Sequence, residues 1–94
     1  MTFRELREIL LEKYGECGII LLEPEYYDKA IVGNDDYGRV IYSYDKLIET
    51  LVEHDGMSEE EAMEWLDYNT LRAIPSMGMM APIVMYPIED DIED

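Results

Sequence analysis

Apolar residues recur at helical spacing in three segments of the chain. In residues 2–14 they fall on one stripe, Thr2 is a good N-cap and Gly15 is a stop signal. That stripe consists of Phe3, Leu6, Ile9 and Leu10. Residues 44–54 repeat the pattern between Ser43 and Gly56, with a stripe of Leu47, Ile48, Leu51 and Val52. Helices are therefore predicted over residues 2–14 and 44–54.

A third helix is predicted to begin after Ser58, because Ser58 and Glu61 have the spacing of a capping box. The helix is expected to fade near Ala73, before Pro75. Its apolar face is predicted to carry Ala62, Trp65, Leu66 and Asn69. A buried Asn69 needs a polar partner, and a hydrogen bond to the following loop is expected.

Two short apolar segments flank a turn sequence and predict a β-hairpin. Residues 29–33 and 39–42 are the strands, and the Asn, Asp and Gly residues between them favour a turn. A third strand is predicted over residues 82–86, with proline at its start and again after its end. Residues 16–28 have no clear period and are expected to form an irregular packed connection.

The order of these elements predicts an α+β fold. We expect a small antiparallel sheet of about three strands, the β-hairpin plus the C-terminal strand, covered by about three helices. The last strand should pair beside the hairpin, within the chain or across a dimer. Residues 1–88 are expected to form a single domain, and residues 89–94 an acidic C-terminal tail.

Charge narrows the classes of partner. The 94 residues include 23 acidic and 7 basic side chains, a net charge of −16. Residues 45–94 hold fourteen acids and two bases, a net charge of −12, so most of the negative charge lies in the second half of the chain. A direct nucleic-acid surface is excluded and an anionic membrane is disfavoured, because both need clustered Lys and Arg. Basic partners, cations or plain solubility are favoured.

Few side chains suit catalysis or metal binding. Cys17 is the only cysteine and His54 the only histidine, so no zinc site or disulfide is expected within one chain. Cys17 is expected to be packed, and His54 to favour a helix C-terminus. Asn34, Asp35 and Asp36 lack the ligand spacing of a calcium loop, and an ordinary turn is favoured. The sequence carries no phosphate loop or nucleophile elbow, so we predict no enzyme, cofactor or metal.

Two sets of residues are candidates for binding. The first would meet a partner through its charge, with a second contact at the hairpin tip, and it consists of Glu59, Glu60, Glu64, Asp67, Asp35, Asp36 and Tyr37. A solvated helix face is the competing explanation for these acids. The second set would hold a small molecule or signalling nucleotide at a dimer interface, and it consists of Tyr68, Asn69, Thr70 and Arg72.

Several strings of the sequence point to one group of proteins when they are read together. They occupy residues 27–33, 39–42, 44–49, 60–65, 67–70, 77–78 and 81–85. Together they resemble a family of small, mostly uncharacterised bacteriophage and prophage proteins, over roughly residues 26–86. The resemblance implies a viral or prophage origin and no known catalytic residues. Small acidic phage proteins often inhibit host defence, and they include anti-CRISPR proteins and nucleic-acid mimics.

The leading hypothesis is therefore an acidic interaction module of phage type. It would inhibit a basic, nucleic-acid-handling host protein, such as a CRISPR effector, and nucleic-acid mimicry is one route to that inhibition. No apolar stretch approaches the length of a membrane span and the N-terminus does not resemble a signal peptide, so the host cytoplasm is the expected location. The alternatives are the small-molecule binder, as a homodimer, and a viral structural or assembly protein.

Overall fold

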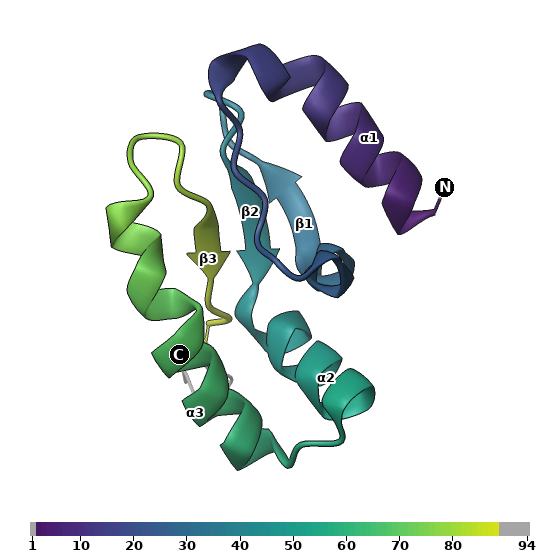
Figure 1. Cartoon of the computed structure of the whole chain (residues 1–94), viewed down its shortest axis with the longest axis vertical. Coiled ribbons are helices and arrows are strands. Elements are labelled where there is room, and N and C mark those ends of the chain that lie inside the picture. Colours follow the sequence, from purple (N-terminus) through teal and green to yellow (C-terminus); the bar gives the residue numbers. More distant parts are fainter. Residues whose placement is uncertain (1, 89–94) are drawn as a thin grey trace, which may run out of the picture.

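The computed structural model describes residues 2–88 and has the α+β architecture expected from the sequence (Figure 1). Helices and strands follow one another as α1 (Phe3–Tyr14), η1 (Gly15–Cys17), η2 (Glu25–Ala30), β1 (Ile31–Asn34), β2 (Val40–Ser43), α2 (Tyr44–Asp55), α3 (Glu59–Asn69), η3 (Leu71–Ser76) and β3 (Ile83–Met85), where η marks a 3-10 helix. The acidic tail predicted over residues 89–94 lies outside the described residues. Within the described part, no helix is long and apolar enough to cross a membrane.

The sheet has the order β1-β2-β3 and is mixed rather than antiparallel. β1 and β2 form the predicted antiparallel hairpin, whereas β3 pairs with β2 in parallel, within the same chain. The expectation of a purely antiparallel sheet was therefore wrong. A parallel pair requires a long crossover connection. Here α2, α3 and η3 form that crossover, and they return the chain to the end of the sheet where β2 begins.

Short polar side chains set the start of each α-helix. The hydroxyl groups of Thr2, Ser43 and Ser58 accept hydrogen bonds from backbone N–H groups in the first turns of α1, α2 and α3. The capping box predicted for α3 is confirmed, because the Glu61 side chain also accepts from the Ser58 N–H. All three boundaries follow from local chemistry that the sequence makes visible.

The connection over residues 16–28 is held by buried groups rather than by a regular period. Leu22 enters the core, and its backbone N–H donates to the buried hydroxyl of Tyr42 at 2.8 Å. Tyr27 and Asp28 are buried within η2, which extends to residue 30. The first strand therefore begins at Ile31, two residues later than predicted, because Lys29 and Ala30 belong to η2.

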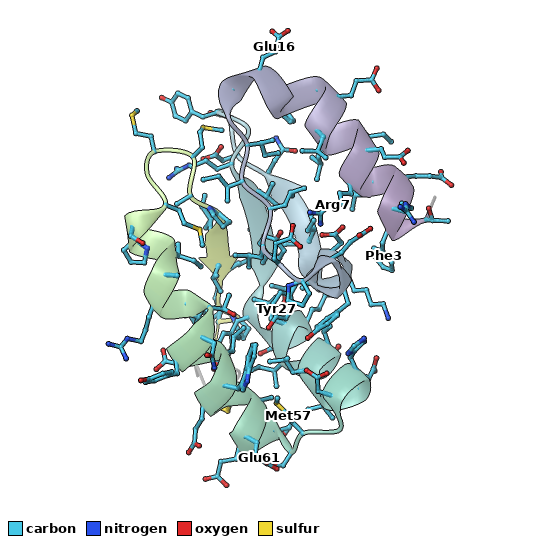
Figure 2. All side chains as sticks on the ribbon, viewed as in Figure 1. Phe3, Arg7, Glu16, Tyr27, Met57 and Glu61 are labelled. Carbon is cyan, nitrogen blue, oxygen red and sulfur yellow. The ribbon has the colours of Figure 1, made fainter. Side chains whose placement is uncertain are left out.

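The core combines buried side chains of η2, β2, α2 and α3 with Leu10 of α1 and Leu22 of the connection that follows it. Its largest fully buried side chains are Tyr27, Tyr42, Leu47, Leu51, Leu66, Val40 and Asp28. Figure 2 places Tyr27 near the middle of the molecule. Cys17, by contrast, is exposed, so the expectation that it would be packed was wrong: it belongs to η1, which has no buried residue.

Helix α1 is attached by a limited apolar contact, made by Leu6, Leu10 and Tyr14, together with a polar one. Leu10 is buried, but Phe3 and Ile9 are nearly half exposed, so the predicted apolar stripe is only partly covered. The helix packs against η1 and η2 at one side of the sheet (Figures 1 and 2). Its Arg7 side chain compensates for the thin apolar contact, since it forms ion pairs with buried Asp28 and exposed Glu23, both at 2.9 Å.

Candidate interaction surface on helix α3

Helix α3 buries one narrow side and exposes the rest. Only Ala62 and Leu66 are buried in it. The predicted acidic residues Glu59, Glu60, Glu64 and Asp67 are all exposed. Glu60, Glu64 and Asp67 follow one another at a spacing of four and three residues, so they share one side of the helix. We call these three residues the acidic stripe.

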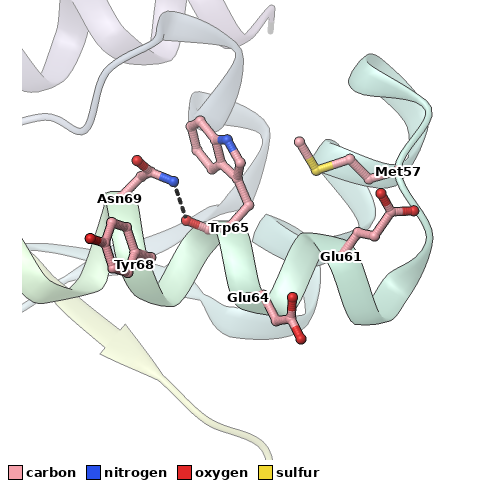
Figure 3. Close-up of a pocket in the computed structure, with 6 residues that line it drawn as sticks. All are labelled: Met57, Glu61, Glu64, Trp65, Tyr68 and Asn69. Carbon is pink, nitrogen blue, oxygen red and sulfur yellow. Dashed lines mark hydrogen bonds between the residues drawn. The ribbon is translucent and has the colours of Figure 1, made fainter.

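A shallow hollow of about 420 Å³ runs along one flank of the acidic stripe (Figure 3). We call it the α3 hollow, and its lining consists of Met57, Glu61, Glu64, Trp65, Tyr68 and Asn69. In Figure 3 the side chains of Met57, Glu61 and Trp65 rise on the same side of the helix, and Glu64 extends from its other edge. Trp65 is 36% exposed and Tyr68 is 69% exposed, which leaves aromatic surface open beside carboxylates.

The other flank of the acidic stripe is also aromatic. A second hollow, of about 290 Å³, is lined by Tyr44, Met63, Glu64, Asp67, Leu71 and Tyr86. The rings of Tyr44 and Tyr86 lie with their centroids 4.8 Å apart. Burial raises the pKa of Tyr44, and the nearby Tyr86 and Asp67 add to the rise. Glu64 therefore stands between two hollows that each combine aromatic rings with carboxylates.

The second predicted set does not form a single ligand site. Tyr68 and Asn69 line the α3 hollow, but Thr70 is only 7% exposed and is not available to a ligand. The Arg72 guanidinium lies 5.0 Å from the centroid of the Tyr68 ring, so it is already engaged within the chain.

Asn69 corrects a further expectation, because it is exposed rather than buried. Its amide nitrogen donates to the Trp65 carbonyl oxygen at 3.0 Å, within α3, and not to the following loop (Figure 3). The buried side of α3 ends at Leu66, one turn before the helical period of the sequence would place its last core position.

The hairpin tip is a separate surface. The Asp35 carboxylate accepts hydrogen bonds from the backbone N–H groups of Tyr37 and Arg39 and forms an ion pair with the Arg39 side chain at 2.6 Å. Desolvation tends to raise the pKa of Asp35, but these hydrogen bonds and the Arg39 charge outweigh it, and the pKa is lowered. The carboxylate thus stabilises the turn rather than facing a partner.

Asp36 and Tyr37 remain outward at that tip, and Tyr37 is 76% exposed. Tyr37 lines a hollow of about 490 Å³ with Arg39, Met79 and Met80, so the hairpin tip lies beside the loop that precedes β3. Figure 1 shows this tip at the upper end of the sheet, whereas α3 begins at the lower end. The two halves of the predicted charged contact therefore do not form one continuous site.

The only histidine belongs to a small polar cluster at the end of α2. The Tyr26 ring stacks on the His54 ring with centroids 3.8 Å apart, and the Tyr26 hydroxyl donates to Asp55 at 3.2 Å. His54 Nδ1 also lies 3.0 Å from Asp55, and that hydrogen bond is the main reason that the pKa of Asp55 is lowered. Across residues 2–88, no three His, Cys, Asp or Glu side chains are grouped as a metal site.

Three residues of the α3 hollow escaped the sequence reasoning: Met57, Glu61 and Trp65. The signal was nevertheless present, because Glu61, Glu64, Trp65 and Tyr68 recur at i, i+3, i+4 and i+7. No protein-family model, curated protein or solved structure matches the chain. The resemblance to phage proteins therefore stays a prediction.

Proposed function

We propose that this protein is a binding module that uses α3 to hold a basic partner protein. The observation that carries the proposal is the acidic stripe with an aromatic hollow on each side. Carboxylates attract Lys and Arg side chains over a distance and help to orient the partner. Exposed Trp and Tyr add contact area and can hold a cation against their rings.

We further propose that the partner is a nucleic-acid-handling protein of a bacterial host, acting in the cytoplasm. Such proteins carry clustered Lys and Arg that contact phosphates, and the same groups accept carboxylates. A chain with a net charge of −16, and −12 in residues 45–94, would compete with nucleic acid for that surface. Inhibition would follow from occupancy of the site, without catalysis by this chain.

Solubility alone explains the acids of α3 but not the rings beside them. A helix that only keeps a protein soluble gains nothing from Trp65 and Tyr68 at its surface, because exposed aromatic side chains favour association. A signalling nucleotide fits the α3 hollow poorly, since Glu61 and Glu64 would repel its phosphates.

The test is a pull-down from bacterial lysate at low salt with two matched double variants. Glu64→Gln/Asp67→Asn removes two charges from the acidic stripe, and Glu49→Gln/Glu53→Gln removes two from the exposed side of α2. We expect a basic nucleic-acid-binding protein to be retained by the wild type and the α2 variant, released by salt, and lost from the α3 variant. Equal behaviour of the two variants, whether both retain the partner or both lose it, would show that the α3 charges are no more important than those of α2 and would reject the α3 surface.

A further inference from the structure

The α3 hollow has a chemical composition that suits one kind of side chain. Glu61 and Trp65 are four residues apart on α3, and so are Glu64 and Tyr68. Residues at this spacing are neighbours on a helix surface, so each ring has a carboxylate one turn before it. The lining therefore offers negative charge and aromatic faces together, which is the combination that binds a flat organic cation.

The chain already holds such a cation at one end of this surface. The Arg72 guanidinium lies over the Tyr68 ring at 5.0 Å from its centroid, within the usual range of a cation–π contact of about 6 Å. Trp is the strongest cation–π acceptor among the side chains. Among residues 2–88, however, the cation–π contacts are those of Lys13 with Tyr14 and Arg72 with Tyr68, so the Trp65 ring holds no cation of this chain.

We infer that the α3 hollow is a receptor site for a single arginine side chain of the basic partner. The guanidinium would lie on the Trp65 ring, with the outer oxygen of Glu61, one turn before that ring, accepting its N–H groups and the Glu64 carboxylate adding negative charge at the other edge of the hollow. One oxygen of Glu61 is already engaged with the Ser58 N–H at 3.3 Å. Arginine fits better than lysine because its guanidinium is planar, is weakly hydrated and can donate two parallel hydrogen bonds to a carboxylate. This assignment rests on the proposed function, since it names the group by which the partner is held.

Because Trp65 is the only tryptophan, its fluorescence reports directly on this site. The probe is a short Gly/Ser peptide with neutral ends and one central arginine, compared with the same peptide carrying lysine or the neutral isostere citrulline. At physiological salt we expect a saturable change in Trp65 emission that is strongest for arginine, weaker for lysine and absent for citrulline. Equal responses to arginine and citrulline would overturn the assignment.

Variants of the chain distinguish binding at the α3 hollow from long-range attraction by the net negative charge. Glu61→Gln should weaken the arginine peptide about threefold, the loss typical of one exposed ion pair, while glutamine keeps the capping-box acceptor at the start of α3. Glu53→Gln, which removes the same charge from α2, should leave the affinity unchanged. Equal weakening by the two variants would reject the site in favour of long-range attraction. Both changes are at exposed positions, and circular dichroism verifies that each variant is folded.

The pull-down then distinguishes failure of this site from failure of the proposed function. Trp65→Leu should release the partner much as Glu64→Gln/Asp67→Asn does. A partner that is retained by Trp65→Leu but lost from the charge variant would overturn the arginine site and leave the α3 surface in place. A partner retained by both variants would overturn the two proposals together.

Discussion

Replacing Arg7 with alanine would leave a carboxylate buried without its counter-charge. One guanidinium nitrogen of Arg7 donates to both oxygens of Asp28, at 2.9 and 3.1 Å, and the other nitrogen donates to Glu23. Asp28 is only 2% exposed, so water cannot replace the lost partner. The same change would also weaken the attachment of α1 to η2, since the Arg7–Asp28 ion pair links the two elements.

The magnitude follows from the burial of the pair. Removing one partner of a buried ion pair typically costs about 3–5 kcal/mol. Arg7 is 16% exposed and its contact with Glu23 is at the surface, so we expect the lower end, about 3 kcal/mol at neutral pH. A domain of this size has a free energy of unfolding of about 5–15 kcal/mol, so the loss is a large fraction of the total.

The loss should depend on pH in a defined direction. Burial raises the pKa of Asp28, and the hydrogen bond and charge of Arg7 oppose that rise. Without Arg7 the pKa rises further. A carboxyl group whose pKa is raised by folding binds its proton more tightly in the folded state. The ionised group therefore destabilises the protein fully above the raised pKa, and the deficit of the variant shrinks as the pH falls through it.

Urea denaturation followed by Trp65 fluorescence measures both effects, at pH 7 and at about pH 5, between the usual pKa of Asp and neutrality. The matched control is Arg4→Ala, which removes the same charge from an exposed position of α1 and should cost less than about 0.5 kcal/mol. Equal losses for the two variants, or a deficit that stays constant with pH, would refute the reasoning.

Two further pairs of substitutions test the packing. Tyr27→Phe should be neutral or stabilising by up to about 1 kcal/mol, because the buried Tyr27 hydroxyl makes no hydrogen bond with the described residues. Burial raises the pKa of this hydroxyl, and the neighbouring Thr70 lowers it only in part. Tyr42→Phe should cost about 1–3 kcal/mol, because it leaves a buried N–H unpaired. An added Cβ at Gly38, where φ is +91°, would lie 2.7 Å from the Tyr14 ring, so Gly38→Ala should cost about 2 kcal/mol or more. Gly56→Ala has φ +70° but open space and should cost about 1 kcal/mol. Urea midpoints that fail to separate the members of either pair would contradict the stated contacts.

The features predicted well from the sequence are those decided by neighbours in the chain. The starts of α2 and α3 follow from Ser43 and from Ser58 with Glu61, whose partners lie within three residues. The direction of β3 could not be predicted in this way. It depends on the path of the whole crossover from residue 44 to residue 82, and strand propensity is the same for either direction.

The binding surface was predicted in part for the same reason. Exposure of Glu60, Glu64 and Asp67 follows from their charge. Helical period placed Trp65 and Asn69 on the buried face of α3, but the helix packs mainly on α2 and η3, and only Ala62 and Leu66 are buried in it. The face of α3 that the sequence predicts to be buried is therefore wider than the face that is buried in the structure.

The parallel pairing of β3 with β2 also sets an order of assembly. The hairpin and α2 involve residues close in sequence, so they can form while the chain is still emerging from the ribosome. The contact between Ile41 and Ile83 has to wait until the entire crossover has been synthesised and folded back. Helix α3 lies within that crossover and packs on α2 and η3, so the α3 hollow can form before the last strand joins, whereas the second hollow, which includes Tyr86 next to β3, is complete only afterwards.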